Sequence, residues 1–417
     1  MDRKKDIGKL LALLCPLIYF ASYLTRKDYS IVMEAIIQAE SLSKESAGLI
    51  ETLSVISYGI GQIVSGFLGD RIRPDKMVTT GMIITVLINL AMPFSDASLR
   101  GILWFINGFA HSLLWPPILR ILTSTMERKD YENVAVNMNI AGIFATVLVY
   151  LSSSLLWIRV FRNWKLTFLV DAVIAALITA FWIIYSPRIE EAMETSEVPS
   201  EMKKESTTPS LHFKSFLIFS GFLFIALAII LQGMLRDGIS DWLPSFMANT
   251  FHMESDSAIF GSVILPVIGI ISLKITGIIN RRFVNDEVKA SAILFLCSFA
   301  LSSLLYGIYE HDRNITLIIA SLIVATMHAI NLFLVGIIPS RFIRYGLVST
   351  MSGVINSLTY VGSASAIYGF GYLSQHFGWN ACLFTWIIIS LLGALSCFLV
   401  IKPWNRFRKQ RSSRDIL

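Results

Sequence analysis

The first long apolar run of the chain reads LLALLCPLIYFASYLTRKDYSIVMEAII from residue 10 to residue 37. It is long enough to cross a membrane, because the hydrocarbon core of a bilayer requires about 20 mostly apolar residues in a helix. A cleaved signal peptide fits poorly. No small-residue cleavage site follows the run, and the charged Arg26-Lys27-Asp28 leads into a further apolar segment. The run therefore predicts an uncleaved membrane-spanning helix.

Eleven further apolar runs of similar length follow, separated by polar segments. Irregular backbone cannot face lipid, so each run is predicted to be helical. The predicted fold class is an all-α membrane protein with twelve transmembrane helices. The spans are expected at residues 10–37, 46–68, 77–95, 100–124, 133–158, 165–186, 213–249, 257–279, 288–308, 314–338, 347–373 and 379–402.

The composition excludes several classes of protein. Of the 417 residues, 54% are hydrophobic and 15% are charged, whereas a soluble domain has about 45–50% apolar and about 25% charged residues. Intrinsic disorder is excluded by the same imbalance. The four cysteines lack CxxC spacing and lie in apolar runs, so they are expected to be small buried hydrophobic residues rather than disulfides or zinc ligands (Cys15, Cys297, Cys382 and Cys397). No metal, cofactor or enzymatic activity is predicted.

The chain is expected to form two six-helix bundles, residues 1–186 and 213–402, joined by a polar cytoplasmic linker at 187–212 and followed by a basic tail at 403–417. An internal repeat supports this division. Leu24-Thr-Arg26 resembles Met234-Leu-Arg236, 210 residues later, and Asp70-Arg71 resembles Asn280-Arg281 at the same offset. Duplicated halves that enclose a site near the bilayer midplane are typical of transporters.

The distribution of basic residues predicts the topology. If the amino terminus is cytoplasmic, 25 of the 35 Lys and Arg residues fall on the cytoplasmic side, six on the outer side and four within spans, as the positive-inside rule requires. We therefore expect a multi-pass protein of the cell membrane with both termini in the cytoplasm. The net charge of +6 then follows from topology, and the tail is expected to contact anionic lipids rather than nucleic acid. A monomer is expected.

Charged residues inside a membrane span cost about 2.5–3.5 kcal/mol each on insertion scales, so each requires a reason. Arg26 and Arg236 lie at similar depth in the first and seventh spans. The planar guanidinium binds phosphate or carboxylate oxygens in a bidentate manner, so one arginine from each half predicts a clamp for a small dianion. The alternative is pairing with neighbouring acids. Asp28 and Asp237 are too close in sequence to share a helix face with their arginines, whereas Asp241 remains a possible partner.

Further polar residues are candidates for the same site. Lys27 is expected to add charge beside Arg26 or to pair with Asp28. Tyr19 and Tyr23 are four residues apart and Tyr23 and Arg26 are three apart, so these side chains form one polar stripe on the first span. Each of the remaining candidates has helix packing as its alternative role. The predicted substrate-binding residues are Arg26, Arg236, Lys27, Tyr19, Tyr23, Tyr58, Asn139 and His328, the last of these with Asn331 one turn later.

Three other groups of residues are assigned to conformational change or helix packing, or are left open. The charged loop from Asp70 and Arg71 to Lys76 suits a salt-bridge latch at the cytoplasmic face, and its first two residues are predicted to be gating residues. Glu34, Glu51 and Asp171 are either proton-relay residues or interfacial residues. Several glycines are expected to permit close helix approach and helix bending (Gly59, Gly61, Gly66, Gly353, Gly362, Gly369 and Gly371).

The twelve spans, the central linker and the Gly69-Asp70-Arg71 loop resemble the major facilitator superfamily. Within it, Tyr19-x-x-x-Tyr23-Leu-Thr-Arg26-Lys27 and Leu235-Arg236-Asp237-Gly238-Ile-Ser-Asp241-Trp242 resemble the helix 1 and helix 7 signatures of organophosphate:phosphate antiporters. Trp115-Pro116-Pro117 with Arg120, and Phe377-Gly378-Trp379, resemble further patterns of that family. The resemblance implies that both signature arginines bind the substrate phosphate.

The chain departs from that family at two positions. Gly142 stands where those antiporters commonly carry a histidine in helix 5, and Gln62 stands where a lysine occurs in the glycerol-phosphate transporter. Both changes make the expected cavity less cationic. His328 is the candidate that would replace the missing imidazole.

The sequence therefore predicts a secondary transporter that exchanges a small organic phosphate, of the sugar phosphate or glycerol phosphate type, for inorganic phosphate by alternating access. No G-x-x-x-x-G-K-[ST] motif is present to support ATP hydrolysis. One alternative is a proton-coupled symporter of another organic anion, such as a carboxylate or phosphonate. The other is a non-transporting membrane receptor for a sugar phosphate.

Overall fold

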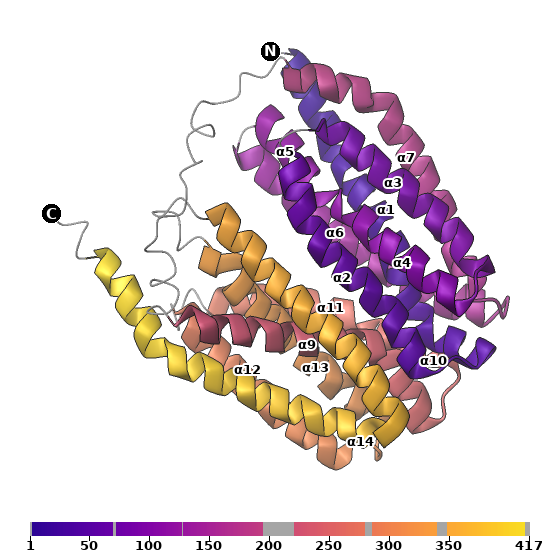
Figure 1. The fold of residues 1–417 in the computed structure, drawn as a ribbon, viewed down its shortest axis with the longest axis vertical. Helices are drawn as coiled ribbons and strands as arrows, with labels where there is room; N and C mark the ends of the chain where they lie inside the picture. The colour runs from indigo at the N-terminus through magenta and orange to yellow at the C-terminus, as the bar shows by residue number, and fades with distance from the viewer. Residues whose placement is uncertain are drawn as a thin grey trace. The chain divides into compact units, whose positions relative to one another are not determined.

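The computed structural model describes residues 2–69, 72–126, 128–194, 221–279, 286–339 and 348–412 (Figure 1). Every regular element in these ranges is helical. In chain order the α-helices are α1 (Asp2–Glu40), α2 (Lys44–Gly69), α3 (Pro74–Ala91), α4 (Ala97–Ser112), α5 (Trp115–Thr125), α6 (Arg128–Ser152), α7 (Lys165–Glu194), α9 (Phe222–Phe251), α10 (Ser255–Ser262), α11 (Ile264–Ile279), α12 (Glu287–Ile308), α13 (Arg313–Asn331) and α14 (Val348–Ser412). Short segments η1 (Met92–Phe94), η2 (Ser153–Ile158) and η5 (Leu332–Ile337) extend three of them.

Eleven candidate membrane spans occur in the described part of the chain, judged by helix length and composition. The last, Gly353–Arg406, is 54 residues long, which is too long for a single crossing. Helical geometry is interrupted within it at Gly378, where φ is 76° and ψ is 175°. The predicted spans 347–373 and 379–402 lie on either side of this break. Glycine adopts the positive φ without steric cost.

Two of the predicted spans are each divided into two α-helices, and two others end as wider π-helical turns. The span predicted at 100–124 consists of α4 and α5, which are separated at Leu113 and Leu114. Pro116 and Pro117 lie in the first turn of α5, and their missing N–H groups cannot continue the hydrogen bonds of α4. The span predicted at 257–279 is likewise interrupted between α10 and α11. The segments η2 and η5 are the π-helical ends of the spans that begin with α6 and α13.

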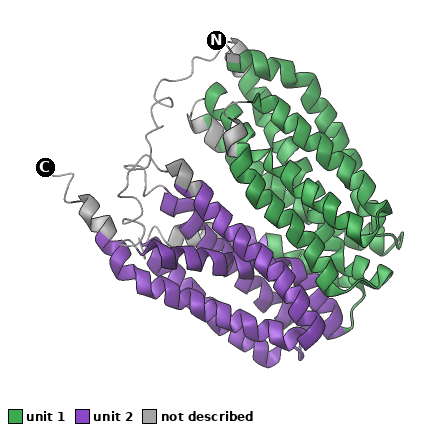
Figure 2. Ribbon diagram, in the orientation of Figure 1, with its two compact units in different colours: residues 1–202, 252–266 green, residues 203–251, 267–417 purple. Residues whose placement is uncertain are grey.

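The chain divides into two compact units, shown in Figure 2. Unit 1 consists of residues 1–202 and 252–266, and unit 2 consists of residues 203–251 and 267–417. α10 therefore packs with unit 1 although it follows α9 of unit 2 in the chain.

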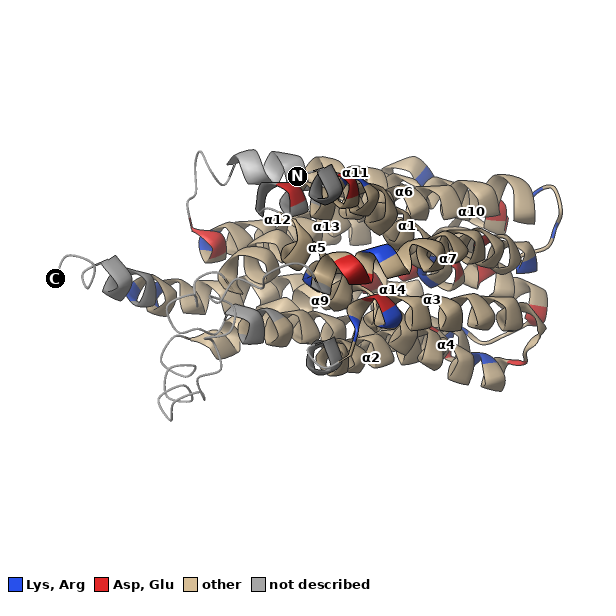
Figure 3. Ribbon diagram, turned by 90° about the horizontal axis from the view of Figure 1, so that it is seen from above, with Lys and Arg blue, Asp and Glu red and all other residues tan. Residues whose placement is uncertain are grey.

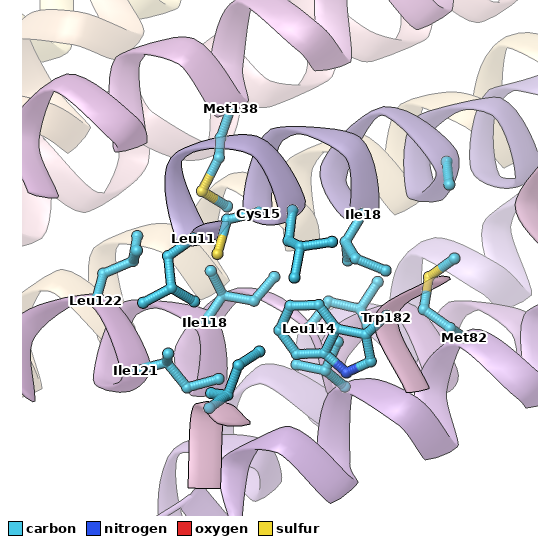
Figure 4. Close-up of a cluster of buried hydrophobic side chains, with 14 of the residues drawn as sticks. Leu11, Cys15, Ile18, Met82, Leu114, Ile118, Ile121, Leu122, Met138 and Trp182 are labelled. Carbon is cyan, nitrogen blue, oxygen red and sulfur yellow. The ribbon is translucent and has the colours of Figure 1, made fainter. Parts of the chain in front are cut away.

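The core of unit 1 is an apolar cluster to which α1, α3, α5, α6 and α7 contribute (Figure 4). Trp182 of α7 is completely buried there, together with Leu11 and Ile18 of α1. The side chains of this cluster differ in size, which allows them to fill the interior densely. In unit 2, Phe246 of α9 lies 5.3 Å from the ring of Trp379 and 6.0 Å from that of Trp386, both of α14.

Three of the four cysteines are buried as expected: Cys15, Cys382 and Cys397. The expectation of burial was wrong for Cys297, which is exposed on α12. An apolar run does not distinguish the two sides of a membrane helix, because lipid and protein interior are both apolar. All four are unbridged thiols.

Charged residues are few along the helices (Figure 3), and one pair in unit 1 is largely buried. The Arg100 guanidinium of α4 donates two hydrogen bonds, of 2.6 and 2.8 Å, to the Glu40 carboxylate at the end of α1. Its side chain is only 3% exposed, and it lies 5.1 Å from the Trp164 ring. This pair connects α1 to α4 at one end of the unit.

We expect Arg100→Leu to destabilise the protein by about 2 kcal/mol. Breaking a buried ion pair costs about 3–5 kcal/mol, and the 32% exposure of Glu40 lowers that figure through solvent screening. The unfolding temperature of the purified protein measures the effect, with Arg313→Ala, at an exposed position at the start of α13, as control. Equal unfolding temperatures for the two variants would contradict the prediction.

The loop predicted to be a latch is described only in part. The gating residues Asp70 and Arg71 lie outside the described residues. Arg73 forms ion pairs with Asp75 (3.0 Å) and with Glu190 of α7, and Ser186 of α7 donates a 2.7 Å hydrogen bond to Asp75. The described part of the loop therefore ties the start of α3 to α7 within unit 1.

Candidate functional site

Arg26 lies in α1 with its guanidinium over the Tyr58 ring of α2, at 3.8 Å from guanidinium carbon to ring centroid. Arg26 is half-buried and Tyr58 is 8% exposed. A desolvated cation over an aromatic face gains about 2 kcal/mol. The structure thus brings together two of the residues that sequence analysis proposed for one site.

Tyr19 and Tyr23 occupy the same face of α1, as their spacing predicts. Their ring centroids are 5.1 Å apart, and the Tyr19 ring is 5.3 Å from that of Trp115 in α5. Tyr19 also interacts electrostatically with Arg26 and Tyr58. Three tyrosines and one arginine therefore form a continuous polar and aromatic group in unit 1. Trp115 belongs to one of the motifs that resemble the family, and its contact with Tyr19 was not predicted.

The peptide bond just before Arg26 is held by buried side chains from two other helices. The Thr25 carbonyl oxygen accepts hydrogen bonds from the side-chain amides of Asn107 of α4 (3.0 Å) and Asn89 of α3 (3.1 Å). The His111 imidazole of α4 lies 3.4 Å from the same oxygen, and the Thr85 hydroxyl donates to Asn107. These contacts fix α1 directly beside Arg26. This network was not predicted from the sequence, although each member is a polar residue in a predicted span.

Gly142 of α6 faces Tyr23. A Cβ atom at this position would lie 3.1 Å from two atoms of the Tyr23 ring, a tight distance that requires the ring to shift. The tyrosine therefore occupies the space into which a longer side chain at position 142 would extend. A histidine at position 142 would therefore require the Tyr23 ring to move.

We expect Gly142→His to displace the Tyr23 ring and to lower the stability of the protein by about 1–3 kcal/mol, the usual cost of overpacking. The unfolding temperature of the purified protein measures the change. The double variant Gly142→His with Tyr23→Ala should recover part of that stability, since the imidazole then has room. A double variant that unfolds at no higher temperature than Gly142→His would show that the two side chains do not compete for space.

Two other predicted residues of unit 1 have different surroundings. Lys27 is half-buried on α1, and its carbonyl accepts a hydrogen bond from Ser30. Asn139 of α6 is exposed, and its amide donates a 2.8 Å hydrogen bond to the Ala135 carbonyl of its own helix. Asp28 is completely buried, and its carboxylate accepts a hydrogen bond from the Tyr29 backbone.

Arg236 of α9 forms a bidentate ion pair with its neighbour Asp237. Its Nε and Nη2 atoms each donate a 2.7 Å hydrogen bond to one of the two carboxylate oxygens. The side chains are 15% and 21% exposed. The expectation that Arg236 and Asp237 cannot pair was wrong. Although adjacent residues point in different directions from a helix, the arginine side chain is long enough for its guanidinium to reach the neighbouring carboxylate. Two of the five guanidinium N–H groups are directed at Asp237.

Asp237 is in turn anchored to α14. The Ser363 hydroxyl donates a 2.5 Å hydrogen bond to Asp237 Oδ2. One turn before Arg236, Gln232 donates to the Met327 carbonyl of α13 (3.1 Å) and accepts a weak bond from Asn331 (3.5 Å). α9 is therefore connected by polar contacts to both α13 and α14 around the arginine.

His328 of α13 lies against α11. Its ring would be 3.4 Å from a Cβ atom at Gly269. The predicted role of His328 at the site stays a prediction.

A cavity of about 430 Å³ lies elsewhere in unit 1. Gln38, Arg159 and Asp256 are among its lining residues. Arg159 and Asp256 form a 3.8 Å ion pair, and Ser255 donates a hydrogen bond to Gln38. These contacts connect α10 to the residue that follows η2 and to α1. The cavity is lined by none of the predicted substrate-binding residues.

Comparison with known proteins places this geometry in a family. The model of the Major Facilitator Superfamily matches residues 17–367. The chain is 26% identical to a glycerol-3-phosphate transporter of Bacillus subtilis (strain 168), with 93% of this chain and 90% of that protein covered. It is 24% identical to a probable hexose phosphate transport protein of Chlamydia muridarum (strain MoPn / Nigg), with 93% and 89% covered.

The fold agrees with that of solved transporters. The crystal structure of a bacterial homolog of the human lysosomal transporter Spinster, inward-facing and unoccupied, matches with a TM-score of 0.73 at 13% identity, covering 96% of this chain and 98% of that one. Such a match at low identity supports the fold alone. The predicted fold class is therefore confirmed. This multi-pass membrane protein belongs to the Major Facilitator Superfamily, whose members are transporters rather than enzymes.

Proposed function

We propose that the protein exchanges a small organic phosphate for inorganic phosphate by alternating access, with Arg26 and Arg236 binding the phosphoryl group. The observation that carries this proposal is an arginine in the middle of a candidate span in each unit, Arg26 in Asp6–Glu40 and Arg236 in Phe222–Phe251, neither of them buried completely. Arginine inside a membrane span is costly and is a functional residue by default. The two names of relatives, a glycerol-3-phosphate transporter and a probable hexose phosphate transport protein, support phosphate esters as the substrate class.

The chemistry of the surrounding side chains suits a phosphate ester. A guanidinium offers parallel N–H donors that match two phosphoryl oxygens. The hydroxyl groups of Tyr19 and Tyr23 offer neutral hydrogen bonds suited to the organic part of the substrate. We assign Lys27, Tyr58, Asn139 and His328 to the same proposed site as further polar residues.

The proposed transport cycle uses substrate binding to shift the conformational equilibrium. A ligand shifts such an equilibrium only by its different affinity for the two states. In the proposed cycle the phosphate therefore interacts with Arg26 and Arg236 more strongly in one conformation than in the other. Asp70 and Arg71 would act at the cytoplasmic gate, and both termini would be cytoplasmic.

Proteoliposomes containing the purified protein and radiolabelled inorganic phosphate provide the test. External glycerol 3-phosphate or glucose 6-phosphate should accelerate efflux of the label, while an imposed proton gradient alone should not. Efflux driven by the proton gradient without external phosphate ester would favour a symporter. Binding of the esters without any flux would favour a receptor. Either result would overturn the proposed exchange.

A further inference from the structure

Arg236, which the proposed function places at the phosphate, already has an anionic partner on its own helix. Asp237 accepts both hydrogen bonds on the edge formed by Nε and Nη2, at 2.7 Å each. This is one of the edges at which a guanidinium binds two oxygens of one anion. The carboxylate therefore occupies the kind of position that a phosphoryl group would take.

The carboxylate is held by the seam between α9 and α14. Ser363, which is completely buried, has its hydroxyl oxygen 2.5 Å from Asp237 Oδ2 and 3.0 Å from the Thr359 carbonyl oxygen of its own helix, and these two acceptors share its single proton. In addition, Gly233 and Gly362 bring the two helices together so closely that a Cβ atom at either position would collide with backbone of the other helix. Asp237 therefore has little freedom to move away from Arg236.

We propose that Asp237 is an internal competing anion that limits the affinity of Arg236 for phosphate. This inference rests on the proposed function of Arg236. Phosphate bound at the Nε–Nη2 edge must displace the carboxylate, and phosphate bound at the other edge remains within a few ångströms of it. In both cases the negative charges repel each other, and the repulsion is strong where water is scarce.

The consequence for transport is a faster release of the bound anion. Conduction through a membrane protein requires binding that is strong enough for entry and weak enough for departure. As phosphate leaves, Asp237 recovers its two hydrogen bonds with Arg236, so that the arginine is not left as an unpaired charge inside the membrane. Asp237 is in this sense a release-promoting residue.

The test is Asp237→Asn in the full-length protein, with inorganic phosphate as the probe. The substitution removes the charge and retains nearly the same shape. We expect phosphate to bind at least tenfold more tightly in titration calorimetry. In proteoliposome exchange, the half-saturating phosphate concentration and the maximal rate should both fall, because release becomes slower. A purely structural role would lower the rate without tightening binding.

Two further variants separate charge from packing. Ser363→Ala breaks the same hydrogen-bond network but keeps the carboxylate, so it should tighten phosphate binding much less than Asp237→Asn does. Asp237→Ser removes the charge with a smaller side chain and should tighten binding as Asp237→Asn does. If both neutral variants fold and neither binds more tightly than the wild type, the proposal is overturned. Failure of both to fold would identify a structural counter-ion and overturn it equally.

Binding by the wild-type protein separates failure of the proposed function from failure of the proposed role of Asp237. If the wild-type protein binds neither inorganic phosphate nor glycerol 3-phosphate, the proposed function fails. If the wild type binds phosphate and Arg236→Ala abolishes that binding, but removal of the Asp237 charge has no effect, the proposed function stands and only the competing role of Asp237 is lost.

Discussion

Phosphate exchange should be abolished by Arg236→Ala, with the affinity for inorganic phosphate falling at least a hundredfold. Loss of two charge-assisted hydrogen bonds removes about 3 kcal/mol or more, and each 1.4 kcal/mol corresponds to about a tenfold change in Kd. The variant also leaves the Asp237 carboxylate without its bidentate partner, which adds repulsion of the phosphate. Calorimetry for binding and proteoliposome flux for exchange measure the two effects.

Arg26→Ala should cause a comparable loss, because the proposed site takes one arginine from each unit. Arg236→Lys keeps the charge but loses the planar fork, and it should bind phosphate about tenfold more weakly than the wild type. Arg313→Ala, at an exposed position, is the matched control and should exchange normally. Near-normal exchange by Arg26→Ala or by Arg236→Ala would contradict the proposed function.

The second large effect is expected at the seam between α9 and α14. Gly362 of α14 faces the Ile230 carbonyl of α9 so closely that a Cβ atom would overlap the backbone. Backbone atoms of a packed helix cannot move aside as a flexible side chain can. Gly362→Ala should therefore force the helices apart and destabilise unit 2 by about 3 kcal/mol, at the upper end of the usual cost of overpacking. The unfolding temperature and the yield of monodisperse protein measure this loss.

Gly369→Ala is a matched control seven residues later in the same helix. A Cβ atom at Gly369 would have no heavy atom within 4 Å, so the added methyl group meets no obstacle. Because alanine has a higher helix propensity than glycine by about 1 kcal/mol, this variant should be as stable as the wild type or more stable. Equal destabilisation by both variants would show that loss of glycine flexibility, rather than helix contact, is responsible.

The glycines in the predicted spans indicate close helix contacts at some positions and not at others. The glycines of the second and eleventh predicted spans were all expected to permit close helix approach. The structure supports this at Gly61, which faces Ser112, and at Gly362. The expectation was wrong for Gly353 and Gly369, which have no heavy atom within 4 Å of their Cβ positions. The sequence shows which residues are small, whereas the rotation of the helix decides which of them meet a neighbour.

The candidate site was predictable where it depends on a single helix. Tyr19, Tyr23 and Arg26 share one face of α1 because a helix repeats every 3.6 residues, and their ring contacts follow that spacing. For Arg26 and Tyr58, the sequence predicted only that two polar residues lie at similar depth in the membrane. It did not predict that their side chains are in contact. The pairing of Arg236 with Asp237 was missed, because the torsion angles of a long side chain, and not the helix period alone, decide which atoms meet.

The amino-acid sequence by itself determined that this is a helical protein of many membrane spans, and it indicated the positions of the spans and of the two embedded arginines. These properties are local, since a bilayer requires long apolar helices and makes every charge within them exceptional. Only the tertiary structure decided which side chains surround those arginines, such as Asn89 and Asn107 at the Thr25 carbonyl and Ser363 at Asp237. The physical reason is that lipid and protein interior are equally apolar. A membrane helix therefore carries little sequence information about which of its faces packs against another helix.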